Sequence, residues 1–360
     1  MKIIPPTLTF LLKALVSLSL LSFLLSRVDV AQLLRVLSSA HVSYLAVALV
    51  GYFLGQVISS VRWALLARPL GFKNPLKEFV LLYFIGMFFN LFAPSTVGGD
   101  LGRVFYLARG RTKREERERG MLTANALISV IADRAIGMAV LVWIGAVALV
   151  VFPEYSLPLV VRAPTFALAL GFLLGWALLP LLKRFLEQRE RAVGQNLSLA
   201  LGIYQSHHQI VPQTVLLSLI VHLLQAWIQL LLGRALDVEI PWSYCFILYP
   251  LVGVFSALPI SLNGIGLREG GYLFLLGQID TSSERAIALG LLWFMIVALD
   301  SLIGGVVFVM RRGPKPSAVA PGIRESGQVM EKDRGETQER EEPEDIGKRG
   351  NKNAGPERRV

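Results

Sequence analysis

The sequence contains few charged residues. Only 17% of its 360 residues are charged and 54% are apolar, with a mean hydropathy of +0.56, whereas a soluble domain carries about 25% charged residues. The charges fall into blocks, and long apolar runs separate those blocks. Because a soluble domain intersperses the two kinds of residue, this segregation argues against one and indicates an integral membrane protein.

Cysteine and the common enzyme motifs are also scarce. Cys245 is the single cysteine, so no intrachain disulfide can form and no metal cluster can rest on thiolates. The sequence has no Gly-x-x-x-x-Gly-Lys-Ser/Thr loop, no His-Glu-x-x-His and no Gly-x-Ser-x-Gly motif. We therefore expect neither a metal nor a cofactor.

The formal net charge of +10 would suit a nucleic-acid partner, but the placement of the charge argues against one. Basic residues gather in connectors such as Arg109–Arg119 and Lys183–Arg191, directly beside apolar spans. Positive residues flank spans on the cytoplasmic side, where they face anionic headgroups. We expect membrane lipids with anionic headgroups as partners, and no nucleic acid.

Eight apolar segments predict an all-α polytopic membrane protein. Two of them, Phe79–Leu107 and Trp242–Leu276, are interrupted by proline and glycine. The other six are long enough to cross a bilayer: Leu8–Leu25, Ser43–Ala67, Met121–Phe152, Thr165–Leu182, Thr214–Gly233 and Arg285–Met310.

The basic blocks predict the orientation. Arg103–Arg119, Lys183–Arg191 and Arg311–Lys315 should all be cytoplasmic. This works when Phe79–Leu107 enters and leaves on the cytoplasmic side and Trp242–Leu276 on the outer side. We therefore expect about six full spans and two re-entrant helical hairpins, in the inner membrane of the cell.

The two interrupted segments share a motif. Proline, glycine and arginine recur at offsets of five and nine, and a span with Asp-x-x-x-Gly follows each motif after 30 and 32 positions from arginine to aspartate. The residues are Pro94, Gly99, Arg103 and Asp133 in the first copy, and Pro259, Gly264, Arg268 and Asp300 in the second. With the opposite orientations of the hairpins, this pattern predicts an inverted-topology repeat, whose substrate site lies at the repeat interface.

The domain boundaries follow from the same pattern. We expect a membrane domain over 1–312, with repeat one at about 43–182 and repeat two at about 213–310. Proline, glycine and charged residues dominate 313–360. Such a segment buries too little apolar area to offset its ordering entropy, so we expect a disordered, charged, cytoplasmic tail.

The breaks predict where a ligand would bind. A broken helix frees backbone N–H and C=O groups, so these segments should be buried in protein or line a wet cavity. Arg103 and Arg268 follow the breaks and are candidates for binding a lipid phosphate, because a guanidinium offers planar donors. The hairpin backbone candidates are Pro94, Gly98, Gly99, Pro259, Asn263, Gly264 and Gly266.

Charged residues inside the apolar segments are costly, at about 2.5–3.5 kcal/mol each on insertion scales. Two interpretations stay open for them. They form internal ion pairs, such as Asp133 with Arg62 or Arg103, or they serve the site, with Asp100 and Glu269 pairing the arginines when no headgroup is bound. The charge-partner candidates are Arg62, Asp100, Asp133, Arg134, Glu269 and Asp300.

The stretches Asn90–Arg103 and Pro259–Gly270 resemble the flippase-like membrane-domain family, known from the membrane half of lysylphosphatidylglycerol synthases. The resemblance covers about residues 5–312. It implies a domain that moves a lipid between leaflets. The soluble aminoacyl-transfer domain of the synthases has no counterpart in the sequence, so we expect a stand-alone member that does not aminoacylate lipid by itself.

Three functions remain in view. The leading hypothesis is a flippase or transporter for an anionic phospholipid or a polyprenyl-phosphate-linked lipid, without catalysis. The second is a lipid-modifying enzyme of the bilayer interface, with Asp100, Asp133 or Glu269 as acid or base. The third is a membrane partner of a lipid-linked glycosyl or aminoacyl transferase.

Overall fold

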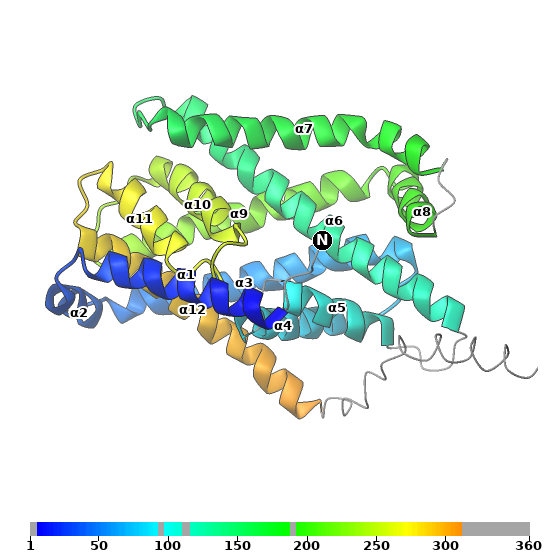
Figure 1. Cartoon of the computed structure of the whole chain (residues 1–360), viewed down its shortest axis with the longest axis horizontal. Coiled ribbons are helices and arrows are strands. Elements are labelled where there is room, and N and C mark those ends of the chain that lie inside the picture. The colour runs from blue at the N-terminus through cyan, green and yellow to red at the C-terminus, as the bar shows by residue number, and fades with distance from the viewer. Residues whose placement is uncertain (1–5, 93–96, 110–115, 188–191, 312–360) are drawn as a thin grey trace, which may run out of the picture. The chain divides into compact units, whose positions relative to one another are not determined.

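The computed structural model describes residues 6–92, 97–109, 116–187 and 192–311, and regular structure in these ranges is helical throughout (Figure 1). The protein is an all-α polytopic membrane protein, as predicted. Its elements are α1 (Pro6–Leu25), α2 (Val30–Ser38), α3 (Val42–Ala67), the 3-10 helix η1 (Arg68–Leu70), α4 (Leu76–Phe92), α5 (Val97–Arg109), α6 (Glu116–Val151), α7 (Leu159–Glu187), α8 (Ala192–Ser206), α9 (Ile210–Ala235), α10 (Trp242–Ala257), α11 (Leu267–Gly277) and α12 (Ser283–Met310).

Five of the described helices are long and apolar enough to cross a bilayer: α3, α6, α7, α9 and α12. The apolar α1 adds a sixth when it is taken together with α2, from which it is bent by 93°. Asp29 begins α2, because its carboxylate accepts hydrogen bonds from the backbone N–H groups of Ala31 and Gln32 at 2.8 and 3.1 Å. The count agrees with the expected six spans.

Both interrupted segments are helical hairpins. α4 packs against α5, and α10 packs against α11. Their 17, 13, 16 and 11 residues fall short of the roughly 20 needed to cross a bilayer. In Figure 1 the second hairpin lies toward the end of the domain that carries α2, while α5 runs toward the opposite end, where α8 lies. The hairpins therefore enter from opposite ends.

The helix packing follows the repeat. α3 lies along α9. Between the halves, α4 packs on α12 as α10 packs on α6, and within the halves α5 packs on α6 as α11 packs on α12. Such a correspondence of contacts is what a two-fold relation between two repeats produces. α7 stands apart and packs mainly on α6 and α8, so it does not contribute to the centre.

The two breaks differ in local structure. Asn263, Gly264 and Gly266 have φ of 51°, 73° and 84°, in the left-handed region that glycine and asparagine tolerate. They form a true break before α11. In the first hairpin, Gly98 and Gly99 do not form the break as expected, because they lie in the first turn of α5. Pro94 lies outside the described residues.

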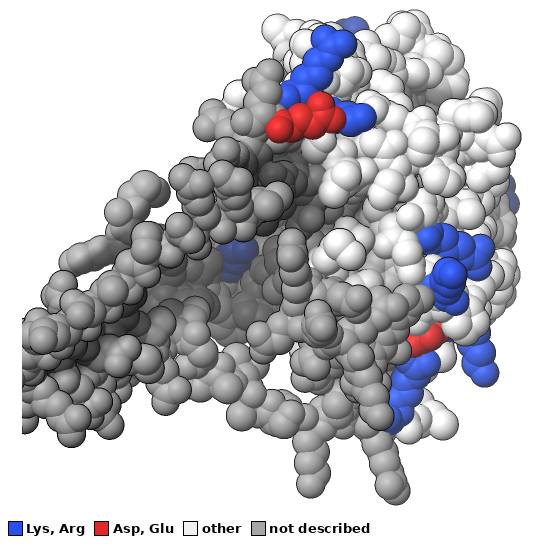
Figure 2. All heavy atoms as spheres, turned by 90° about the vertical axis from the view of Figure 1, so that its right-hand side faces the viewer, with Lys and Arg blue, Asp and Glu red and all other residues white. Residues whose placement is uncertain are grey.

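The two ends of the helical domain differ in charge. Figure 2 views the end that carries α8, where more Lys and Arg than Asp and Glu are visible. The described helix ends and turns there contribute Arg68, Lys73, Lys77, Lys183, Arg184 and Arg311, with Glu78 and Glu187. The opposite end is mixed, with Arg27, Arg35, Arg162, Arg234 and Arg285 beside Asp29, Glu154, Asp237, Glu239, Asp280 and Glu284.

Candidate functional site

A half-open cavity with about 660 Å³ of empty space lies where the two hairpins meet α3, α6 and α12. Arg103 of the first hairpin and Arg268 of the second both line it. The remaining lining residues are Tyr52, Gln56, Tyr83, Gly86, Met87, Asn90, Leu91, Arg134, Asn263, Phe294, Val297 and Ser301. Segments about 165 positions apart in the sequence thus contribute equivalent arginines to one wall.

The hairpin tips are held against each other. The side-chain amide of Asn263 donates to the carbonyl oxygen of Leu91 at 2.9 Å, which joins the second break to the end of α4. The backbone N–H of the neighbouring Leu262 donates to the hydroxyl of Ser17 in α1 at 2.8 Å. These bonds satisfy backbone and side-chain groups at membrane depth that lipid could not.

Arg103 is 2% exposed and is fixed by two aromatic rings. Its guanidinium carbon lies 4.0 Å from the ring centre of Tyr83 and 4.6 Å from that of Trp63. Nη1 bonds Asp100 at 3.2 Å, and Nη2 lies 3.5 Å from Asp133. Nε and Nη2 are buried and have no hydrogen-bond partner among the described residues, so Arg103 has unused donor capacity beside the cavity.

Arg268 pairs with its neighbour. Nε and Nη2 both donate to Oε1 of Glu269, at 3.0 and 2.7 Å, and the guanidinium lies 5.0 Å from the ring centre of Phe294. Both bonds use the Nε–Nη2 edge of the guanidinium, which leaves Nη1 available. Glu269 therefore orients the guanidinium without engaging all of its hydrogen-bond donors.

The half-helix N-termini are capped by side chains. The N–H of Gly266 donates to Oε2 of Glu269 at 2.7 Å, and the N–H of Gly99 donates to Oδ1 of Asn90 at 2.9 Å. A carboxylate at the start of α11 also opposes the positive end of the helix dipole. The N–H groups of Gly266 and Gly99 are thus engaged, and the arginines supply the positive potential of the cavity.

Arg134 is the third arginine in the cavity wall. It grips Asp100 through Nη2 at 2.9 Å and Nε at 3.0 Å, and its side chain is 52% exposed. Asp100 thereby bridges Arg134 to Arg103. The cavity entrance therefore carries a charge pair in which one guanidinium stays accessible.

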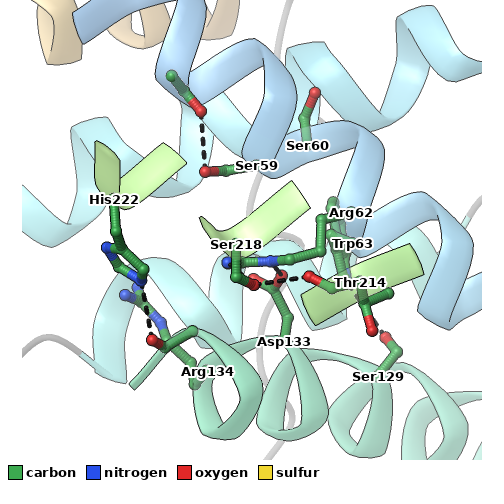
Figure 3. A network of polar contacts seen from close by, with 12 residues as sticks. Ser59, Ser60, Arg62, Trp63, Ser129, Asp133, Arg134, Thr214, Ser218 and His222 are labelled. Atoms are coloured by element: carbon green, nitrogen blue, oxygen red, sulfur yellow. Dashed lines mark hydrogen bonds and ion pairs between the residues drawn. The ribbon is translucent and has the colours of Figure 1, made fainter. Parts of the chain in front are cut away.

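A second polar cluster ties the central helices together (Figure 3). Arg62 of α3 lies between α6 and α9, and bonds Asp133 and Ser218, each at 2.8 Å. His222 of α9 donates or accepts at Tyr249 and contacts the carbonyl oxygen of Gly137 at 2.9 Å. Of the two interpretations left open for Asp133, the ion pair with Arg62 is thus present, and Asp133 also neighbours Arg103.

Asp300 differs from the other candidate charge partners. It is 2% exposed, its Oδ2 has no hydrogen-bond partner, and no Lys, Arg or His among the described residues lies within ion-pair distance of it. Of the two interpretations left open for Asp300, the internal ion pair is therefore not found in the described part of the chain, although the repeat motif places Asp300 at the position equivalent to Asp133.

Several residues of the site were not singled out from sequence, among them Tyr52, Gln56 and Tyr83, which line the cavity, and Trp63, whose ring contacts Arg103. Tyr52 and Gln56 are four positions apart, which puts them on one face of α3. A polar face of this kind within an apolar span was a usable signal. The role of Trp63 and Tyr83 carried none, because aromatic residues in a span usually pack against apolar neighbours.

Within the described ranges, no group of three or more His, Cys, Asp or Glu side chains comes together in a way that could hold a metal ion. The polar groups that line the cavity are instead guanidinium, amide, phenol and hydroxyl groups. This set is suited to an anionic oxygen ligand.

Comparison with known proteins agrees with this architecture. A region of 136 residues is 27% identical to the UPF0104 membrane protein MJ1595 of Methanocaldococcus jannaschii. That match spans 38% of this chain and 38% of the relative's length. Residues 10–304 match the family model of the lysylphosphatidylglycerol synthase TM region. Because this match takes in both hairpins and the spans around them, the chain belongs to the family of the lysylphosphatidylglycerol synthase TM region.

Proposed function

We propose that the protein moves an anionic lipid, a phospholipid or a polyprenyl-phosphate-linked lipid, between the leaflets of the membrane. One observation carries the proposal: Arg103 and Arg268, from two hairpins that enter from opposite ends, line the same cavity. In transporters built from inverted repeats, the substrate site lies at the repeat interface near the bilayer midplane.

The chemistry of the cavity favours a phosphate. Arg103 keeps Nε and Nη2 free of hydrogen bonds, and Arg268 keeps Nη1 beside its bonds to Glu269. Hydrogen bonds between such ionised donors and a phosphate are worth about 1.5–3 kcal/mol each. Phosphate is common to both lipid classes, so the proposal names the shared group.

The charge distribution supports an orientation in the inner membrane of the cell. The end with Lys73, Lys77, Lys183 and Arg184 is the more basic one, as expected of a cytoplasmic face. Helix α12 ends at the same face, at Met310. We therefore propose that the tail after it is cytoplasmic.

The three carboxylates considered as acid or base for a lipid-modifying enzyme are engaged in ways that favour transport over catalysis. Asp100 pairs with Arg134, Asp133 with Arg62, and Glu269 with both Arg268 and the N–H of Gly266. A general base or acid needs a carboxyl group that is free to exchange its proton with substrate. For this reason we prefer a transporter to the lipid-modifying enzyme.

Reconstitution tests the proposal. Purified protein in liposomes should redistribute a labelled anionic phospholipid or polyprenyl phosphate between leaflets, as followed by quenching of the outer-leaflet label. Arg103→Lys and Arg268→Lys keep the charge but remove the planar fork, and the double variant should lose most of the lipid movement.

Arg162→Ala is the matched control, because Arg162 is exposed at the far end of α7 and away from the cavity. It should move lipid at the wild-type rate. Unchanged movement in the double variant, with an unchanged melting temperature, would falsify the assigned site. A change in the headgroup mass of the lipid would instead favour the enzyme.

A further inference from the structure

Asp300 is the one described carboxyl group in the membrane interior without a positive partner. Asp100, Asp133 and Glu269 each lie within 3.5 Å of an arginine nitrogen. Asp300 has no such neighbour among the described residues, and its Oδ2 makes no hydrogen bond. A charged, unpaired carboxylate in this setting is strongly disfavoured.

Asp300 lies too far from either end of α12 for water at a helix end to reach it. α12 runs from Ser283 to Met310, so ten residues follow Asp300, about 15 Å of helix at 1.5 Å per residue. The next turn contacts α4 closely, since Gly304 lies against the backbone of Phe84 and Gly305 against the ring of Phe88. Asp300 is therefore far from the end of α12, and close packing of α12 against α4 separates it from that end.

The cavity nevertheless reaches its immediate surroundings. Val297 and Ser301, three positions before and one after Asp300, line the cavity, as does Tyr52. A small cation that enters the cavity would thus come close to this carboxyl group. A large cation could not reach it, because only 2% of Asp300 is exposed.

The helices packed on α12 supply no fixed counter-charge. In the interior of the domain these helices carry the phenols of Tyr52 on α3, Tyr83 on α4 and Tyr272 on α11. Their charged groups there are Arg62 on α3, which pairs with Asp133, and the pair of Arg268 with Glu269 on α11. His222 on α9 bonds Gly137 and Tyr249, and Arg35 on α2 bonds the backbone of its own helix. Each charged one is already engaged.

We propose that Asp300 is a proton-binding site and that its protonation is coupled to the movement of the anionic headgroup through the cavity. This inference rests on the proposed function. Binding of a proton neutralises the carboxylate of Asp300, so that it does not repel a phosphate passing through the low-dielectric interior. The arginines bind the headgroup, and Asp300 takes up a proton as the headgroup enters and releases it after the headgroup has left.

Proteoliposomes with imposed pH gradients test the coupling. In the wild type, a gradient should change the rate of movement of a labelled anionic phospholipid severalfold, and lipid movement should shift the signal of a pH-sensitive dye in the lumen. Asp300→Asn keeps the shape of the side chain but binds no proton at this position. It should lose both responses. Asp280→Asn, the same change at an exposed turn residue, should keep them.

Other outcomes decide between the two proposals. Lipid movement that ignores the pH gradient, a full gradient response in Asp300→Asn, or a dependence on sodium in place of protons would overturn proton coupling and leave lipid transport standing. When no lipid moves in any protein, the transport proposal fails. Infrared difference spectroscopy then still tests Asp300, because the carbonyl band of a protonated carboxyl group should be present in the wild type and lost in Asp300→Asn.

Discussion

Arg62 and Asp133 bring opposite charges together in the interior of the protein, where their side chains are 7% and 1% exposed. Burying two charges is costly, and the attraction between them repays this cost only when the geometry is good. Here Arg62 also bonds Ser218, and Asp133 also neighbours Arg103. The cluster connects α3, α6, α9 and α5. It therefore fixes the relative positions of these helices, and its contribution to the net free energy of unfolding is small.

Removing the carboxylate of Asp133 should therefore be far more harmful than removing an exposed one. Asp133→Asn leaves Arg62 and Arg103 short of a counter-charge, and we expect a loss of about 3–5 kcal/mol, measured as a lower melting temperature in detergent. Asp237→Asn is the control, because Asp237 is 67% exposed and pairs only with His41. Equal melting temperatures for the two variants would contradict this account.

Two glycines three positions apart in α5 should respond in opposite ways to alanine. A Cβ at Gly99 would collide with the carbonyl oxygen of Gly86 and the side chain of Asn90, whereas one at Gly102 would make an ordinary contact of 3.6 Å with Phe89. Overpacking against backbone costs about 1–3 kcal/mol. Alanine in place of glycine in a helix is otherwise favourable by about 0.5–1 kcal/mol.

Gly99→Ala should accordingly lower the yield of monodisperse protein in size-exclusion chromatography, and Gly102→Ala should match or exceed the wild type. Because both substitutions change helix propensity in the same way, the difference between the two variants reports on the contact between α4 and α5. A stable Gly99→Ala would mean that the two helices separate easily.

At the scale of elements, hydropathy and charge were sufficient to predict the long helices and the two hairpins. They missed α2 and α8, which have 9 and 15 residues, because short helices carry too little apolar sequence to stand out from a connector. They also predicted one kind of break for both hairpins. The second helix of the first hairpin begins at a contact between two helices, because Asn90 of α4 accepts from the N–H of Gly99. That of the second hairpin begins with a local cap, in which Glu269 accepts from the N–H of Gly266 three positions before it.

The hairpin topology predicts which connectors share a side. With re-entrant hairpins, Lys73 and Lys183 lie on one side of the membrane, and Asp237 and Asp280 lie on the other. Single cysteines at these four positions, in a Cys245→Ala background, should react with a membrane-impermeant maleimide as two pairs from opposite sides. If either hairpin were one full span, the members of a pair would separate.

At the scale of the whole helical domain, the sequence could predict that two arginines are equivalent but not that they share a cavity. Equivalence follows from the Pro-Gly-Arg spacing, whereas convergence depends on α3 lying along α9 and on the contact between the hairpin tips. The same arrangement raises the question of how the cavity opens. In inverted-repeat transporters one repeat rocks against the other around a fixed site.

Such rocking would break the hydrogen bond between Asn263 and the carbonyl oxygen of Leu91, since this 2.9 Å bond joins the second break to the first hairpin. A short bis-maleimide bridge between Leu91→Cys and Asn263→Cys, again in Cys245→Ala, should stop lipid movement, because the two repeats could no longer separate at the cavity. Each single-cysteine protein treated with the same reagent measures the effect of a label in the cavity wall alone, and should retain more lipid movement than the bridged protein. Full transport by the bridged protein would show that the tips move as one body, and the alternating opening would then have to lie elsewhere in the domain.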